Sequence, residues 1–266
     1  MEYADPVTAA ATSLRAQLLD AYKSRSLKPP DWAFRVAPSI PFVGDRYGEW
    51  GGVLVYASAE NLAGYGGDLP DFLLDDRARD RHRWCLENRH QDRLFPHVHM
   101  EPFNNGSLLV AAWYLLHRLG HKSPAKPLEL LHGIAAANFG KFAISGSTNR
   151  DYAGSRDKLA ASLPYVTEDL RVLKPTIVVA PKTMLKHPDV AQLFKRETPA
   201  TRVVSLPQFN ATVVNTHLAK NARRAKKLAR DMSGTPVAGW IGNLTGYGDG
   251  AAWRFLVEME ERIAER

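Results

Sequence analysis

A carboxylate and a carboxamide follow the first predicted buried strand of the chain. The apolar β-formers of Val53–Ala57 predict this strand, and Ser58, Glu60 and Asn61 come directly after it. In an open α/β sheet, ligands bind in the crevice beyond the carboxyl ends of the strands. Glu60 could therefore orient an attacking water, with Asn61 in its place if the loop register differs by one residue. The alternative is that one of the two caps a following helix.

A second polar candidate lies at or near the end of the next predicted strand. The apolar run Leu131–Phe142 predicts that strand, which carries Asn138. A carboxamide offers both a donor and an acceptor, so Asn138 could recognise a ligand edge that presents the complementary pair. The structural alternative is a strand-end asparagine in a turn.

A third candidate, His217, follows the last predicted strands. One strand is predicted at Arg202–Leu206, and a further one is considered at Ala211–Asn215. A histidine can donate a hydrogen bond to a group that gains negative charge during a reaction. Gln208 or Asn210 could take that place instead, and a purely structural role for His217 stays open.

Histidines are concentrated in one stretch that could bind a metal. The metal-ligating residue types there are His82, Cys85, His90, His97, His99 and Glu101. His97 and His99 at alternate positions would share one face of an extended segment beside Glu101, which is a three-ligand set for zinc. No familiar ligand spacing repeats downstream, so we expect no metal.

Several other chemistries are disfavoured by the sequence. Cys85 is the single cysteine, which excludes an internal disulfide, a four-cysteine iron–sulfur cluster and a zinc ribbon. The chain has no Gly-x-Ser-x-Gly elbow and no glycine-rich phosphate cradle of the Walker or Rossmann type. No cofactor is expected.

The charge distribution indicates a polyanionic partner. The formal net charge is +7, and basic residues gather between positions 220 and 230. A basic surface attracts nucleic acid through its long-range field. Arg223, Arg224 and Lys227 are the candidates for contacts with phosphate groups, and a merely solvated helix face is the alternative.

The order of predicted elements indicates an α/β fold in one domain of 266 residues. Residues 1–40 form an N-terminal helix and an irregular lead-in. Strands are also predicted at 176–180, and helices at 8–23, 73–89, 106–119, 155–173, 221–231 and 251–263. Strands that alternate with helices favour a mostly parallel sheet covered on both faces.

The sequence also bears on where the protein works. No apolar run approaches the length that spans a bilayer, and the amino terminus lacks the pattern of a secretory signal. We therefore expect a cytoplasmic protein that does not associate with membranes. The oligomeric state is left open.

Three stretches resemble the uracil-DNA glycosylase superfamily over roughly residues 40 to 220. Gly44–Tyr47 followed by GGVLVYASAEN resembles the approach to its first motif. AAANFGKF, centred on Asn138, resembles its second strand, and LRVLKPTIVVAPK resembles a later helix-to-strand passage. Two signature motifs differ: Ala57–Asn61 replaces Gly-Gln-Asp-Pro-Tyr or Gly-Glu-Ala-Pro-Gly, and the late His-Pro-Ser is missing.

The resemblance implies a three-layer α/β/α sandwich with a central mostly parallel sheet. It also implies a DNA glycosylase of base excision repair, which hydrolyses the N-glycosidic bond of a flipped base such as uracil in single- or double-stranded DNA. Glu60 or Asn61 would orient the water, Asn138 would read the Watson–Crick edge, and His217 would assist the leaving base. The remaining substrate-binding candidates are Ser58, Tyr65, Phe139, Gln208 and Asn210, of which Tyr65 or Phe139 would stack on the base or belong to the core. The alternative is a nucleic-acid-binding protein of the same fold that does not cut DNA.

Overall fold

The computed structural model describes most of the predicted sheet and its helices. The described residues are 9–25, 30, 38, 40–59, 104–120, 130–142, 156–206, 212–235, 238, 241 and 250–264. Several predictions lie outside them, namely those for Glu60, Asn61, Tyr65, Gln208, Asn210, the histidine-rich stretch 82–101 and the helix at 73–89.

A five-stranded sheet forms the centre of the fold, in the order β1-β3-β2-β4-β5. The strands are β1 (Phe42–Val43), β2 (Val53–Ala59), β3 (Ile134–Gly140), β4 (Ile177–Pro181) and β5 (Arg202–Leu206). The four strands from β3 to β5 are parallel, and only β1 pairs antiparallel, at the edge beside β3. The predicted α/β class and mostly parallel sheet are confirmed.

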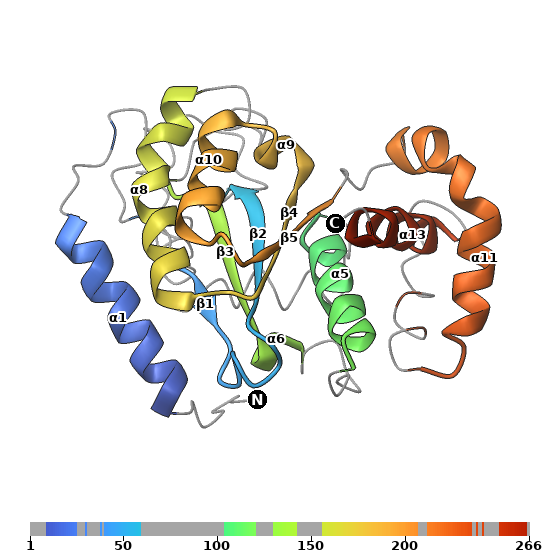
Figure 1. Ribbon diagram of the computed structural model, residues 1–266, viewed down its shortest axis with the longest axis horizontal. Helices are drawn as coiled ribbons and strands as arrows, with labels where there is room; N and C mark the ends of the chain where they lie inside the picture. The colour runs from blue at the N-terminus through green and yellow to red at the C-terminus, as the bar shows by residue number, and fades with distance from the viewer. Residues whose placement is uncertain are drawn as a thin grey trace, which may run out of the picture.

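Helices cover both faces of this sheet (Figure 1). On one side lie α1 (Ala9–Arg25), α8 (Arg156–Leu173), α9 (Lys182–Leu185) and α10 (Pro188–Glu197). On the other side lie α5 (Asn104–Arg118), α11 (Ala222–Asp231) and α13 (Ala251–Ala264), and the short α6 (Leu130–Gly133) leads into β3. The helices predicted at 8–23, 106–119, 155–173, 221–231 and 251–263 are confirmed.

The alternation of side chains along each strand divides the core in two. In β2, Val53 and Val55 belong to the cluster with α5 and α13, whereas Leu54 and Tyr56 belong to the cluster with α1, α8 and α10. Successive side chains in a strand point to opposite faces, so a sheet with helices on both sides is apolar along its whole length. This explains why β2, β3 and β4 read as continuous apolar runs.

The strand considered at 211–215 is wrong. Val213–His217 forms a π-helical turn, η2, in which the Leu218 amide donates to the Val213 carbonyl at 2.9 Å. A 3-10 turn, η3 (Ala219–Asn221), then leads into α11. The β-branched residues favour a strand locally, but Val214 is buried in the core on the α13 side, and packing overrides this propensity.

The sequence analysis did not predict the crossover between β4 and β5. The chain forms α9 and α10 there, and Pro188 occupies the first turn of α10, where its missing amide costs nothing. Val190, Leu193 and Phe194 are buried at helical spacing. That spacing, behind a proline, is the signal that could have revealed the helix.

A close approach between Gly133 and Trp50 gives a test of the packing before β3. A Cβ atom at Gly133 would lie 1.8 Å from Cε3 of Trp50, whose ring is buried. We expect Gly133→Ala to lower the free energy of unfolding by about 1–3 kcal/mol, as overpacked cores do. Urea denaturation measures the loss, and Trp50→Leu in the same chain should relieve part of it. An unchanged unfolding midpoint in Gly133→Ala would contradict this packing.

Candidate functional site

The sheet order makes the carboxyl end of β2 the place where a ligand crevice is expected. This strand lies between β3 and β4. The connection from β2 to β3 contains α5 on one face, and the connection from β3 to β4 contains α8 on the other face (Figure 1). Where successive connections leave on opposite faces, a crevice opens beyond the carboxyl ends of the strands.

Asn138 lies near the carboxyl end of β3, beside β2. It pairs with Ala57 of β2 across the parallel ladder, and Ala59 pairs with Gly140. Asn138 is only 8% exposed. Side chains alternate along β3, so Asn138 points to the same face as Ile134 and Ala136, which is the face covered by α5 and α13. Ala59 is the last residue of β2, and Glu60 and Asn61, which follow it in the sequence, lie outside the described residues.

Two other predicted site residues point away from Asn138. Ser58 follows Tyr56 by two residues, so its side chain is on the α8 face of the sheet. Phe139 is fully buried on that same face, stacked on Tyr56 with ring centroids 4.3 Å apart and edge-on to Phe194 at 6.1 Å. Of the two roles considered for Phe139, the structure shows packing in the core.

A buried polar network joins the ends of β2 and β3 to the helices on the α8 face. Nζ of Lys141 lies 2.5 Å from Oδ2 of Asp169, and both side chains are fully buried. Tyr22 donates to Oδ1 of Asp169 at 2.5 Å, and Tyr56 donates to Oδ2 at 2.9 Å. The Lys141 amide donates to Oγ of Ser162 at 2.9 Å. The network therefore fixes the backbone just after β3 as well as a side chain of β2.

Burial dominates the electrostatics of this network. It lowers the pKa of Lys141, and the Asp169 carboxylate acts against that shift. It raises the pKa of Asp169, while the ammonium of Lys141 and the hydroxyls of Tyr22 and Tyr56 act to lower it. The pKa values of both tyrosines are raised well above the ordinary range, first by burial and then by Asp169, so both hydroxyls remain donors.

The sequence analysis missed this network, although one signal was present. Leu159, Val166 and Leu170 define the buried stripe of α8, and helical spacing places Asp169 on that stripe. A carboxylate at such a position needs a partner, because an unpaired buried charge is very costly. The identity of that partner, Lys141, depends on the pairing of β3 and α8 in space.

His217 is the last residue of η2 and is exposed. The turn that carries it packs against α13, and Arg254 of that helix donates to Oδ1 of the neighbouring Asn215 at 3.3 Å. His217 is thus held on the same side of the sheet as Asn138, but not at the end of a strand. Its role in a reaction stays a prediction.

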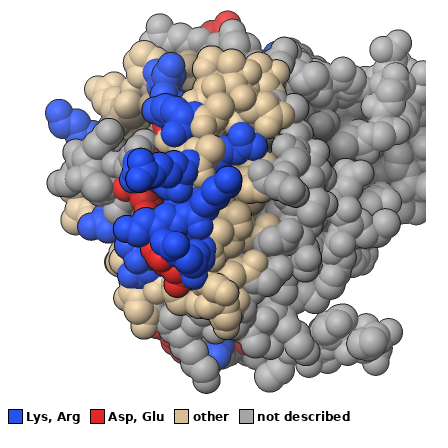
Figure 2. Space-filling view, turned by 90° about the vertical axis from the view of Figure 1, so that its right-hand side faces the viewer, with Lys and Arg blue, Asp and Glu red and all other residues tan. Residues whose placement is uncertain are grey.

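The predicted phosphate-binding residues lie on the outer face of α11. Ala225 is buried and Leu228 half-buried against the core on the α13 side, which turns the basic residues outward. Figure 2 shows lysine and arginine side chains gathered on this side of the molecule. The exposed cations of α11 are Arg223, Arg224, Lys226, Lys227 and Arg230. Asp231 is the only acidic residue of the helix, so this face is strongly basic.

The described residues contain no group of three or more His, Cys, Asp or Glu side chains that could hold a metal ion. In the same part of the chain, no helix combines the length and apolar character needed to cross a membrane.

Comparison of the chain with protein-family models, with curated proteins and with solved structures found no match.

Proposed function

We propose that this protein is a DNA glycosylase that hydrolyses the N-glycosidic bond of a flipped, deaminated base such as uracil, on a uracil-DNA glycosylase-like α/β/α sandwich. The observation that carries the proposal is the pairing of β2 and β3 at the switch point. It places Asn138 beside the carboxyl-terminal part of β2, the strand that Glu60 and Asn61 follow in the sequence. A shielded carboxamide at such a position is suited to reading one planar ligand.

The reaction requires a nucleophile and a way to disperse charge. Water attacks C1′ of the sugar as the bond to the base breaks, and the bonding electron pair leaves with the base. In this proposal Glu60 orients the water and accepts its proton, or Asn61 orients it, and the sugar gains oxocarbenium character. Asn138 donates to a carbonyl oxygen of uracil and accepts from its N3–H. His217 is the proposed donor toward the departing base.

The basic face of α11 supports the choice of DNA as substrate. Extruding a base from a duplex costs a few kcal/mol, and contacts with phosphate groups offset part of that cost. Arg223, Arg224 and Lys227 are exposed there and are the proposed contacts. The altered signature motifs favour the second candidate, a nucleic-acid-binding protein without hydrolytic activity, for which α11 alone would suffice.

The decisive experiment is an incision assay. Labelled single-stranded and duplex oligonucleotides containing uracil, hypoxanthine or xanthine are incubated with the protein and treated with alkali. We expect strand scission at the modified base, and its loss in Glu60→Ala. Asp20→Ala is the matched control, because it also removes a carboxylate, at an exposed position of α1 that belongs neither to the proposed site nor to the turn that carries His217. Binding of the oligonucleotides without scission by the wild type would favour the non-catalytic alternative.

A further inference from the structure

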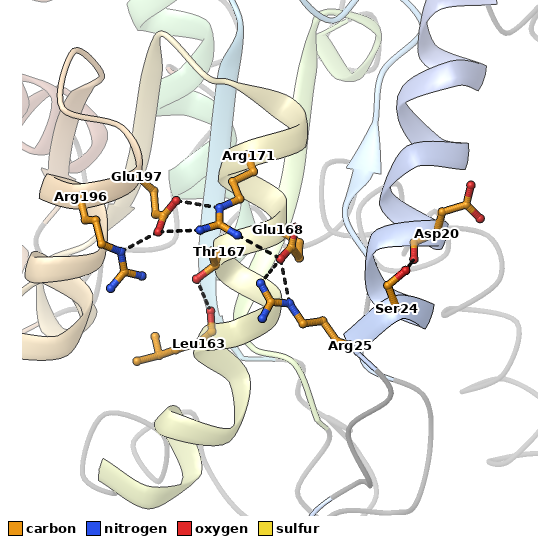
Figure 3. A network of polar contacts seen from close by, with 9 residues as sticks. All are labelled: Asp20, Ser24, Arg25, Leu163, Thr167, Glu168, Arg171, Arg196 and Glu197. Atoms are coloured by element: carbon orange, nitrogen blue, oxygen red, sulfur yellow. Dashed lines mark hydrogen bonds and ion pairs between the residues drawn. The ribbon is translucent and has the colours of Figure 1, made fainter.

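Two grooves flank helix α10, and they differ in whether their cationic side chains form ion pairs. The first, of about 480 Å³, lies between α1, α8 and α10, and is lined by Arg25, Arg171 and Arg196. These cations are matched by carboxylates (Figure 3). Arg25 pairs with Glu168, Arg171 donates to Glu197 at 2.8 Å, and Arg196 donates to the same carboxylate at 2.6 Å. These ion pairs therefore join the helices around the groove, and they leave little uncompensated charge for binding a ligand.

The second groove, of about 640 Å³, lies between α9, α10 and β5, and its cations have no carboxylate partner among the described residues. Lys182, Lys186 and Lys195 line it, and all three are exposed. The described residues that line it include no acidic residue. Within the described part of the chain, none of the three ammonium groups takes part in an ion pair. Thr198 and Thr201 add hydroxyls to the wall, and Phe194 and Val203 supply apolar surface.

This second groove, here called the lysine groove, runs along β5 and reaches the carboxyl ends of β4 and β5. Lys182 directly follows Pro181, the last residue of β4, and Ser205 of β5 also lines the groove. Pro181 and Leu206 pair at the end of the sheet. Figure 1 shows α9 at the same end of the sheet as the tip of β2. One end of the groove thus lies at the same end of the sheet as Asn138.

We propose that the lysine groove binds the phosphate backbone of a single-stranded segment of nucleic acid. This inference rests on the proposed function and adds a second contact region, on the other side of the sheet from α11. Lysine is a point charge on a flexible stem, which suits backbone contacts that carry no sequence information. A single small anion would need a closed cradle of buried donors, whereas these ammonium groups are exposed and come from two helices.

The test measures binding of fluorescein-labelled oligothymidylate by fluorescence anisotropy over a range of salt concentrations. The variant K182Q/K195Q removes one charge from each helix of the groove. The control K23Q/K174Q removes the same charge from exposed residues of α1 and of the turn before β4, neither of which lines the groove. Each lost contact lowers the salt slope by about 0.7 for single strands. We expect the groove variant to lose about 1.4 in slope and about 20-fold in affinity at roughly 0.1 M salt.

The outcomes separate the groove from the proposed function. An equal loss of affinity in the two variants would overturn the proposed role of the groove, but it would not contradict the proposed glycosylase function. Selective loss in K182Q/K195Q would support the groove even where the wild type excises no uracil. Displacement of the oligonucleotide by an excess of thymidine monophosphate would indicate a mononucleotide site. It would overturn the proposal that the groove binds a strand of nucleic acid. Failure of the wild type to bind the oligonucleotide would overturn the groove, whereas the incision assay decides the proposed glycosylase function separately.

Discussion

Replacing Asp169 by alanine is expected to lower the free energy of unfolding by about 3–5 kcal/mol, the usual cost of leaving one partner of a buried ion pair alone. The variant strands the ammonium of Lys141 in a fully buried position and removes the acceptor of two tyrosine hydroxyls. Chemical denaturation at neutral pH measures the loss. Asp20→Ala, at an exposed position of α1, is the control and should change stability by less than about 0.5 kcal/mol.

The pH dependence of this defect distinguishes a stranded charge from a simple cavity. Burial already lowers the pKa of Lys141 from 10.5, and removal of Asp169 takes away the charge that opposes the shift. At pH values between the lowered pKa of Lys141 in the folded variant and its ordinary value of 10.5 in the unfolded chain, the unfolded chain binds more protons than the folded one. The free energy of unfolding of the variant therefore rises with pH over this range. The deficit of Asp169→Ala should therefore shrink as the buffer is made alkaline. A deficit that stays constant with pH would count against a charged Lys141.

Replacing Asn138 by alanine is expected to lower kcat/KM for uracil excision by about 100-fold. Alanine leaves two hydrogen-bonding groups of the base without partners in a shielded site, at about 1–3 kcal/mol for each group. A loss of 1.36 kcal/mol corresponds to a factor of ten in rate. Single-turnover excision from a uracil-containing oligonucleotide provides the measurement.

The same variant should keep its affinity for DNA without uracil. The proposed backbone contacts come from α11 and the lysine groove, neither of which includes Asn138. Circular dichroism melting confirms that the variant is folded. If Asn138→Ala excised uracil as fast as the wild type, Asn138 would be a structural residue of the strand end and the proposed base-reading role would be wrong.

The sequence by itself determined most of the elements. Apolar runs identify β2, β3 and β4 because a strand buried on both faces has no polar side to interrupt it. Helical spacing identifies α8, and the run of basic residues identifies the charged face of α11. These features are local, since each depends only on the residues of its own segment.

The tertiary structure alone decided which residues meet. The order of the strands places Asn138 beside Ala57, the fold brings Lys141 to Asp169, and packing on the α13 side makes a turn of Val213–His217 rather than a strand. In the described part of the chain, lysines without an ion pair line one side of α10 and paired arginines line the other, and this difference likewise depends on neighbouring elements. Contacts between residues far apart in the chain arise from the packing of whole elements, and no local pattern records them.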